Sequence, residues 1–435
     1  MMKNIRAFAA KLLSDMEEHG SYSSLTLTAA LKRENLNAAD AGLASRLFYG
    51  VLERQITLDY YIAKLSGKKP KKLEPLVRNI LRVGLYQLKY LSKIPKSAAV
   101  NECVNAAKLL NFQYSAGFIN AVLRGFIREE PPLPTDNSLY ALSVRYSCPT
   151  GLLTNLIAYL GQNDALLFLK DALSVPPTYI RVNPLKTDEP TLLRELCANG
   201  ISVERCPLDG ALSIRNAGDI ASCEAFISGK FHVQDLASQL LIKTLDPKPQ
   251  EKVLDVCAAP GGKSCTAAEY MKNRGLVLSC ELYEHRLKLI SENAERLSLE
   301  IVKGLKNDGT VYNDALGTFD KILCDVPCSG FGVIRRKPEI RYKNLKELTN
   351  LPELQYNILN ISANYLKDGG LLMYSTCTLS EAENEQVVDR FLSEHAEFSK
   401  VLTTVDGENS FYHRLLPQKL GCDGFFFALL KKGRC

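Results

Sequence analysis

The chain has 435 residues but no tryptophan, no long apolar run and no internal repeat. The missing tryptophan excludes nothing, but the missing apolar run does, because a membrane helix needs roughly 20 apolar residues in succession. Residues 1–18 have the pattern of an amphipathic helix and lack the apolar centre and cleavage site of a signal peptide. We therefore expect no membrane segment, and the 46% of hydrophobic residues is enough for two or three packed cores.

Cysteine pairs with metal-site spacing are also missing. The 13 cysteines are an odd number, they are spread along the whole chain, and none forms a CxxC pair. This pattern disfavours a disulfide scaffold and a structural zinc site, and it is typical of reduced thiols in a cytoplasm. We therefore expect a cytoplasmic protein that needs no metal.

Acidic residues are scarce in one segment. Residues 51–100 contain 11 Lys and Arg against 3 Asp and Glu, a local charge of +8 in a chain whose net charge is +6. Such a charge run is either a solvated face or a surface for nucleic-acid phosphates. Its densest part, residues 68–72, contains four lysines beside Gly67 and Pro70, which interrupt helices and predict a loop tip.

Three parts follow one another along the chain. Residues 1–130 have apolar residues at three- and four-residue spacing, as in Leu43, Leu47 and Val51, which predicts an all-helical domain. Prolines between residues 131 and 134 then predict a linker. Residues 138–230 have strand patterns on both sides of a helical one, which predicts a small α/β module.

From residue 231 to residue 435, strand and helix patterns alternate. Strands are predicted at residues 252–256, 276–280, 301–302, 321–324, 371–374 and 424–430, and helices at residues 264–272, 283–297, 351–366 and 381–395. Alternation of this kind is typical of a mostly parallel sheet covered by helices on both faces. The predicted fold class is α/β, with a doubly wound domain after a small α/β module and an all-α domain.

A glycine turn follows the first strand of the doubly wound part. It consists of Cys257, Ala258, Ala259, Pro260, Gly261, Gly262 and Lys263. Ligands of such sheets bind at the carboxyl ends of the strands, where glycines and a helix amino end favour a carboxylate. A Gly-Gly pair alone is more often an ordinary tight turn.

Two acidic residues make the ligand interpretation stronger. Glu281 ends the next strand, where an acidic residue commonly binds ribose hydroxyls, and Asp308 follows the third strand, near the expected adenine edge. The GxGxxG and P-loop patterns are absent, which disfavours dinucleotide and nucleoside triphosphate sites. We therefore predict an S-adenosylmethionine site.

Two cysteines follow predicted strands at the same edge of the sheet. Cys328 comes three residues after Asp325, and Cys377 follows Thr376. A thiolate that adds to carbon 6 of cytosine turns the ring into an enamine, whose carbon 5 takes a methyl group before a base removes the proton there. A carboxyl group that holds the ring nitrogen helps the addition, and Asp325 is placed for that role. The combination predicts methyl transfer to carbon 5 of a pyrimidine, although most single cysteines are small buried hydrophobic residues.

Motifs along the whole chain resemble one protein family. They lie at residues 45–54, 118–124, 179–187 and 233–238, in addition to the glycine turn and the two cysteine motifs. The chain is similar to the bacterial 16S ribosomal RNA cytosine-carbon-5 methyltransferases with an amino-terminal NusB-like domain. The resemblance implies a NusB-like RNA-binding domain at residues 1–130, an RRM-like module at 138–230, and a class I, Rossmann-like catalytic domain at 231–435 that uses S-adenosylmethionine.

The resemblance also implies a role for each site residue. Cys377 corresponds to the nucleophile, and Cys328 to the thiol that is needed for product release. Asp325 corresponds to the carboxylate beside the methyl donor and the target base. The cofactor contacts correspond to residues 257–263, Glu281, Asp308 and Asp325. Family members often have Ala where Val326 stands, a change that we expect packing to absorb.

The expected partner is RNA, with 16S ribosomal RNA as the substrate of a monomeric enzyme. Arg335, Arg336 and Lys337 follow the Cys328 motif and are predicted to hold phosphates beside a base that has left its stack. A solvated basic loop is the alternative for these three residues. For the whole chain, the alternatives are the same chemistry on transfer RNA, a non-catalytic RNA-binding protein, and a small-molecule methyltransferase. Only the NusB-like domain favours the ribosomal substrate.

Overall fold

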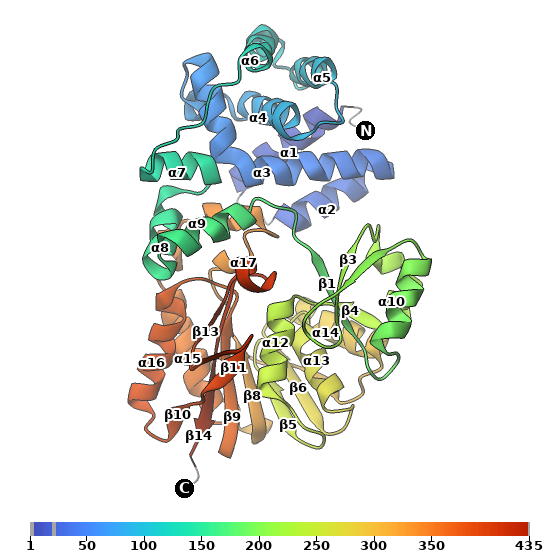
Figure 1. Ribbon diagram of the computed structural model, residues 1–435, viewed down its shortest axis with the longest axis vertical. Helices are drawn as coiled ribbons and strands as arrows, with labels where there is room; N and C mark the ends of the chain where they lie inside the picture. The colour runs from blue at the N-terminus through green and yellow to red at the C-terminus, as the bar shows by residue number, and fades with distance from the viewer. Residues whose placement is uncertain (1–3, 20–22, 434–435) are drawn as a thin grey trace. The chain divides into compact units, whose positions relative to one another are not determined.

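The computed structural model describes residues 4–19 and 23–433, and the chain forms two compact units (Figure 1). Unit 1 comprises Met1–Ser174 and Ile334–Lys343, and unit 2 comprises Val175–Val333 and Asn344–Cys435. The first three residues of the predicted helix at residues 1–18 lie outside the described ranges. No helix within those ranges has the length and hydropathy that crossing a membrane requires.

Unit 1 is helical, as the spacing of its apolar residues predicts. Its helices are α1 (Ile5–His19), α2 (Ser23–Glu34), α3 (Ala38–Ser66), α4 (Pro75–Tyr90), α5 (Lys96–Leu109), α6 (Ala116–Arg128), α7 (Leu139–Tyr146), α8 (Thr150–Leu160) and α9 (Gln162–Asp171). Helix α3 begins where the Asn37 side chain accepts a bond from the Asp40 N–H, and it ends at Gly67 in the left-handed conformation. The predicted loop tip is confirmed, since residues 67–69 are not helical and Pro70–Lys72 form a single 3-10 turn.

The two units divide the chain at different places from the three predicted domains. Helices α7, α8 and α9 belong to unit 1, although the sequence pattern assigns residues 138–230 to one α/β module. The segment Ile334–Lys343 leaves unit 2 after Val333 and also packs in unit 1. The division into three domains therefore stays a prediction.

The first sheet of unit 2 has four antiparallel strands in the order β2-β3-β1-β4. Its elements are β1 (Thr178–Val182), α10 (Glu189–Ala198), β2 (Ser202–Arg205), β3 (Ala211–Arg215), α11 (Glu224–Ile227) and β4 (Phe231–Val233). Its core includes Ile180, Leu192, Leu196 and Phe231. The small α/β arrangement predicted around residues 179–203 is present.

The large sheet of unit 2 has the strand order β10-β14-β9-β8-β5-β6-β7, with β13 paired to β14. Its strands are β5 (Lys252–Asp255), β6 (Leu276–Glu281), β7 (Val302–Lys306), β8 (Phe319–Asp325), β9 (Leu366–Thr376), β10 (Phe398–Lys400), β13 (His413–Leu415) and β14 (Phe425–Lys432). Strands β7, β6, β5, β8 and β9 are parallel, and β14 is antiparallel to β9. The predicted doubly wound sheet is therefore present, and its last strand is the aromatic one.

Helices cover both faces of the large sheet (Figure 1). They are α12 (Leu236–Leu245), α13 (Gly262–Tyr270), α14 (Glu284–Leu297), α15 (Leu351–Ala363) and α16 (Glu385–Glu394). Side chains that alternate along a strand enter different cores: Val253 packs with residues of α12, α13 and α14, and Leu254 packs with residues of α15 and α16. Such burial on both faces explains why these strands are nearly continuous apolar runs.

Two predicted boundaries in this part are wrong. The third strand is Val302–Lys306 rather than residues 301–302. The prediction stopped too early because the exposed Lys and Gly residues of this strand interrupt the apolar run that identifies a buried strand. The helix predicted at residues 381–395 is broken: Glu381–Glu383 form a 3-10 turn, and α16 begins only at Glu385. The break places Glu383 and Asn384 in buried positions.

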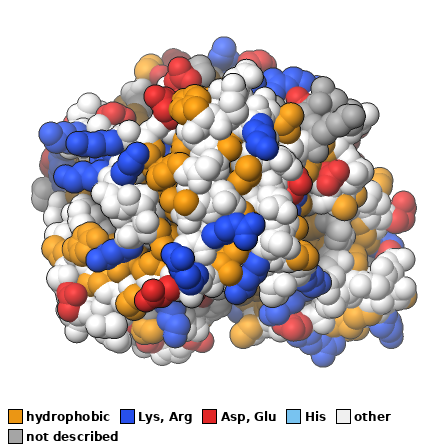
Figure 2. Space-filling model, turned by 90° about the horizontal axis from the view of Figure 1, so that it is seen from above, with side chains coloured by type: hydrophobic (Ala, Val, Ile, Leu, Met, Phe, Trp, Pro, Cys, Tyr) orange, Lys and Arg blue, Asp and Glu red, His pale blue; other side chains and the backbone are white. Residues whose placement is uncertain are grey.

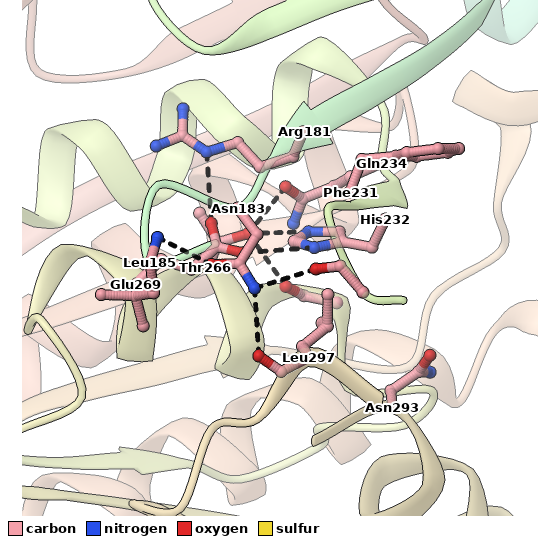
Figure 3. A network of polar contacts seen from close by, with 12 residues as sticks. Arg181, Asn183, Leu185, Phe231, His232, Gln234, Thr266, Glu269, Asn293 and Leu297 are labelled. Atoms are coloured by element: carbon pink, nitrogen blue, oxygen red, sulfur yellow. Dashed lines mark hydrogen bonds and ion pairs between the residues drawn. The ribbon is translucent and has the colours of Figure 1, made fainter. Parts of the chain in front are cut away.

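A buried polar network joins the small sheet to α13 (Figure 3). Glu269 of α13 is fully buried and contacts Arg181 Nε at 3.3 Å and His232 Nδ1 at 3.4 Å. Thr266, one turn earlier on α13, donates to Gln234 Oε1 at 2.8 Å. Because α13 begins at the glycine turn, these contacts fix the helix that carries the predicted cofactor site.

Candidate active site

The predicted cofactor, thiol and carboxylate residues of unit 2 all lie at the carboxyl edge of the large sheet. The glycine turn follows β5, Glu281 is the last residue of β6, and Asp325 is the last residue of β8. Asp308 follows β7, and Cys377 follows β9. This edge is where doubly wound sheets bind ligands.

The glycine turn has the conformation that the sequence predicts. Gly261 has φ of +99°, and a Cβ atom there would lie 3.2 Å from the Ile290 Cα, so a side chain is disfavoured twice. Helix α13 starts at Gly262 without a side-chain cap, so its first N–H groups are available to an anionic ligand. A cavity of about 230 Å³ lies beside this turn and is lined by residues including Gln234, Asp255 and Asp325.

Two buried polar atoms lining this cavity have no hydrogen-bond partner among the described residues. They are Oδ1 of Asp255 and Nε2 of Gln234, one an acceptor and the other a donor. Buried polar atoms are normally paired, so an unpaired donor and an unpaired acceptor from two residues that line one cavity indicate a ligand that carries both kinds of group. The ammonium and carboxylate groups of an amino acid fit this pair, and S-adenosylmethionine carries both.

Asp255 also has a perturbed acidity. Its side chain is 1% exposed. Burial raises the pKa of Asp255 to about 7, and the Asp325 charge acts in the same direction against the Ser264 hydrogen bond. The folded protein therefore keeps this carboxyl neutral up to near neutral pH, whereas the unfolded chain ionises it from about pH 4.

This difference predicts how Asp255→Asn changes stability with pH. Between pH 4 and pH 7 the parent loses stability as the pH rises, because the folded state holds the Asp255 proton more tightly than the unfolded state. The asparagine variant has no such proton. The unfolding temperature of the variant minus that of the parent should therefore increase between pH 5 and pH 8 in thermal unfolding without ligand. An unchanged or decreasing difference would contradict this assignment.

A lysine and a carboxylate form an ion pair between the glycine turn and the thiols. Lys263 Nζ lies 2.6 Å from Asp325 Oδ2, and Ser375 Oγ donates to Asp325 Oδ1 at 2.9 Å. Burial works against the ammonium, but Asp325 outweighs it and raises the pKa of Lys263. The Cys377 charge acts in the same direction on Lys263, and because this attraction is mutual the ammonium favours the thiolate form of Cys377.

The two predicted thiols lie in contact. Cys328 Sγ and Cys377 Sγ are 3.3 Å apart, with either one able to donate. The hydrogen bond to Cys377 raises the pKa of Cys328 well above its usual value, and burial and the charges of Cys377, Glu383 and Asp325 add to it. A pair so close titrates as one unit that shares a proton.

Backbone bonds hold the two thiol loops together. The Gly332 N–H donates to the Cys377 carbonyl at 3.0 Å, and the Gly424 N–H donates to the Gly332 carbonyl at 3.0 Å. A Cβ atom on Gly332 would lie 1.9 Å from the Gly424 oxygen. A glycine is thus required there for the loop after Cys328 to reach the end of β9.

The remaining cofactor residues lie at the ends of the neighbouring strands. Arg286 Nη1 donates to Glu281 Oε1 at 3.2 Å, and its Nη2 donates to the Ala259 carbonyl at 3.0 Å. Arg286 therefore ties the acidic end of β6 to the glycine turn. Asp308 is exposed and accepts bonds from the N–H and hydroxyl of Thr310. No group of three or more potential metal ligands occurs in residues 4–19 and 23–433.

The predicted RNA residues Arg335, Arg336 and Lys337 belong to unit 1. Arg335 is 6% exposed and pairs with Asp171 at 2.6 Å, while Lys337 is exposed. These residues therefore belong to a different unit from the two thiols, and their contact with RNA stays a prediction. Arg335 would have to leave Asp171 before it bound a phosphate.

Fewer cations of the basic segment at residues 51–100 are free to bind phosphates than its charge of +8 implies. Arg82 is 3% exposed and pairs with Asp59 and Glu17, and Arg78 also pairs with Glu17. The lysines at residues 68–72 are exposed. Figure 2 shows Lys and Arg side chains in several separate groups rather than in one continuous patch. The loop at residues 68–72 is the best candidate surface that this segment offers.

Sequence reasoning did not assign several polar residues of this edge. Asp255 is the last residue of β5, and its position at the end of a predicted strand could have identified it as a site residue. Gln234, Arg286 and Glu383 reach the site from other elements, and each has a partner at least 27 residues away in sequence: Thr266, Ala259 and Ser329 respectively. No local sequence pattern predicts such contacts.

Comparisons with known proteins agree with this geometry. Residues 242–431 match the 16S rRNA methyltransferase RsmB/F family, and residues 3–128 match the NusB family. The Bacillus subtilis (strain 168) protein named "Probable ribosomal RNA small subunit methyltransferase B" is 38% identical over 447 residues, with 99% of each chain covered. The chain belongs to the RsmB/F methyltransferase family.

Solved structures support the same family fold. The crystal structure of PH0851 covers 99% of this chain and 100% of its own, with 27% identity and a TM-score of 0.83. NSun6 from Pyrococcus horikoshii, solved with SFG, covers 66% of this chain and 99% of its own, with 24% identity and a TM-score of 0.60. The predicted Rossmann-like core and helical amino-terminal part are therefore confirmed.

Proposed function

We propose that this protein transfers a methyl group from S-adenosylmethionine to carbon 5 of a cytosine in 16S ribosomal RNA, through a covalent adduct with Cys377. The observation that carries the proposal is the 3.3 Å contact between Cys377 and Cys328 beside the Lys263–Asp325 pair. The resemblance to the 16S ribosomal RNA methyltransferases implies cytosine 967 as the target, and we include this position in the proposal. Such a substrate places the protein in the cytoplasm.

The two thiols have different tasks in the proposed reaction: one adds to the base, and the other removes a proton. The Cys377 thiolate forms a bond to carbon 6, which makes carbon 5 nucleophilic, and Asp325 holds the ring nitrogen during this addition. When bound, S-adenosylmethionine supplies the methyl group that carbon 5 takes. Cys328 then removes the proton from carbon 5 as a thiolate, and the bond between Cys377 and carbon 6 breaks.

The coupled titration of the thiols orders these steps. Before addition, the hydrogen bond and charge of Cys377 raise the pKa of Cys328 and keep it protonated. Once the Cys377 sulfur is bonded to carbon 6, both influences are gone and the pKa of Cys328 falls, while burial, Glu383 and Asp325 continue to raise it. We propose that Cys328 releases its proton to water at this stage and then acts as the base. One proton is released for each methyl group transferred, as the overall reaction requires.

Residues of the carboxyl edge fit the methyl donor. The buried Asp255 and Gln234 atoms and the amino end of α13 would hold its amino acid part. Glu281 and Asp308, which follow the next two strands, would hold its ribose and adenine.

Methyl incorporation tests the substrate. Labelled S-adenosylmethionine is supplied with protein-free 16S ribosomal RNA or with transfer RNA, and incorporation into each RNA is measured. We expect label in 16S ribosomal RNA only. Label in transfer RNA alone would support the same reaction on a different substrate, transfer RNA. No label in either RNA would favour a non-catalytic RNA-binding protein.

The loop at residues 68–72 is proposed to bind RNA phosphates. Replacing Lys69, Lys71 and Lys72 with alanine should weaken RNA binding and reduce the slope of log affinity against log salt by up to about 0.9 for each lysine that contacts a phosphate. The measurement is filter binding at several salt concentrations, with the exposed Lys288→Ala as control. An unchanged slope would remove this loop from the RNA surface.

These point variants are better than removal of residues 1–130. That truncation is also expected to weaken RNA binding and its salt dependence. It removes helix α3, however, whose Glu53 carbonyl accepts a hydrogen bond from Arg341 at 2.9 Å. A truncated protein would therefore combine lost charge with a disturbed segment Ile334–Lys343.

A further inference from the structure

Two adjacent buried residues, Glu383 and Asn384, lie where the helix predicted at residues 381–395 is broken. Glu383 is 4% exposed and Asn384 is fully buried. Neither was assigned a role by the sequence, and both form hydrogen bonds with residues next to the thiols. The break in the helix is what turns both side chains towards the thiol loops.

Glu383 holds both neighbours of Cys328. Its carboxylate accepts the Ser329 N–H at 2.9 Å and the Ser329 hydroxyl at 2.6 Å. It also accepts a bond from Gln355 Nε2 at 3.0 Å, and the same amide donates to the Pro327 carbonyl at 2.9 Å. The residues immediately before and after Cys328 are therefore fixed through one carboxylate.

Asn384 holds both neighbours of Cys377. Its Oδ1 accepts the Thr376 hydroxyl at 2.6 Å, and its Nδ2 donates to the Thr378 carbonyl at 3.2 Å. The two halves are linked, because the Thr378 and Ser329 hydroxyls are 2.6 Å apart. Since Ser329 donates its only hydroxyl proton to Glu383, Thr378 must donate to Ser329.

The carboxyl group of Glu383 is buried and is the acceptor for three donors. The three donors are a backbone N–H, a hydroxyl and an amide, and a carboxyl group can accept from all three, whereas an amide in its place would turn one acceptor into a donor. After the hydrogen bond to Cys377 and burial, the Glu383 charge is among the influences that raise the pKa of Cys328. The part of Glu383 that the proposal uses is therefore its set of hydrogen bonds, which fix the loop that carries Cys328.

We propose that Glu383 and Asn384 are positioning residues that assign the two thiols to different steps. Asn384 holds Cys377 for addition to carbon 6, and Glu383 holds Cys328 for removal of the proton from carbon 5. The proposal rests on the covalent mechanism proposed above, and it predicts opposite defects for changes at two neighbouring residues. A purely structural role would give the same defect for both.

The test compares adduct formation by full-length variants on denaturing gels, together with turnover on 16S ribosomal RNA. Glu383→Gln keeps the size of the side chain and removes its charge, and Ser329→Ala removes one of its bonds. Both variants should turn over at least about tenfold more slowly, and both should accumulate a protein–RNA adduct, because release depends on a positioned base. Asn384→Ala should also slow turnover but should form less adduct than Glu383→Gln, because addition itself is impaired.

The dissociation constant for S-adenosylmethionine is measured by calorimetry for each variant. It should stay within about twofold of the parental value, since neither Glu383 nor Asn384 lines the cofactor cavity. Glu381→Gln is the matched control, because Glu381 belongs to the same 3-10 turn but is exposed. It should behave as the parent does in every assay.

The outcomes separate this proposal from the proposed function. If Cys328→Ser accumulates no adduct, the covalent mechanism itself is wrong. If Cys328→Ser accumulates one, the positioning proposal is overturned when Glu383→Gln and Ser329→Ala both turn over at the parental rate without adduct. It is also overturned when the Glu383 and Asn384 variants lose adduct formation and cofactor binding together.

Discussion

Replacing Cys328 with serine should leave a covalent protein–RNA adduct that survives a denaturing gel, whereas replacing Cys377 with serine should leave none. The two sulfurs are 3.3 Å apart, but only one of them forms the bond to carbon 6 in the proposed mechanism. Without Cys328, addition and methylation proceed and release fails. Without Cys377, addition never occurs.

The effects on turnover should be among the largest that any single change in this protein produces. Loss of the nucleophile should reduce methylation on the order of 10⁴-fold or more, and loss of the base by roughly 10²- to 10⁴-fold. The measurement combines gel analysis of adducts with methyl incorporation. Cys265→Ser is a suitable control, because Cys265 is fully buried on α13 and takes no part in the proposed steps. Identical behaviour of the Cys328 and Cys377 variants would show that the roles are wrongly assigned.

Replacing Arg341 with methionine should destabilise unit 1 strongly. Arg341 is 1% exposed and lies in the segment Ile334–Lys343. Its guanidinium donates to carbonyls at three places in the helical fold and to one in its own segment: Glu53, Ser147, Ala172 and Ile334. Ser147 and Ala172 are the C-caps of α7 and α9, where a cation is favourable.

A methionine of similar length removes all four of these hydrogen bonds from a buried position. The free energy of unfolding of unit 1 should fall by roughly 3 kcal/mol or more. Hydrogen exchange of the amides in α7, α9 and the segment itself reports this loss locally. Arg341→Lys should be intermediate, because an ammonium has fewer donors. The exposed Lys337→Met should change exchange little, and an Arg341→Met protein with parental exchange would contradict the anchoring role.

The sequence predicts the carboxyl edge of the sheet well, because each part of it follows a continuous buried strand. The apolar runs before Asp325 and Cys377 exist because both faces of β8 and β9 are covered. Parallel strands end at the same edge, so residues that follow them meet there without any signal for the contact itself. The 3.3 Å approach of the thiols depends on β8 and β9 being neighbours in the sheet, an order that the structure shows and that was not predicted from the sequence.

Contacts that depend on distant segments are what the sequence does not reveal. The position of Arg335 after the Cys328 motif predicts a phosphate-binding residue. In the structure, however, Arg335 forms an ion pair with Asp171 at the end of α9. Arg82 adds to the basic charge run but is neutralised by Asp59 and Glu17. Charge counts along the chain do not distinguish a solvated cation from one that is paired across a helical core.

The central claim is that the product is 5-methylcytosine at one position of 16S ribosomal RNA. The most direct measurement is bisulfite sequencing of 16S ribosomal RNA after incubation with S-adenosylmethionine and either the parent or Cys377→Ser. We expect one protected cytosine with the parent and none with the variant. Methyl label in the RNA without a protected cytosine, or equal protection by the variant, would contradict it.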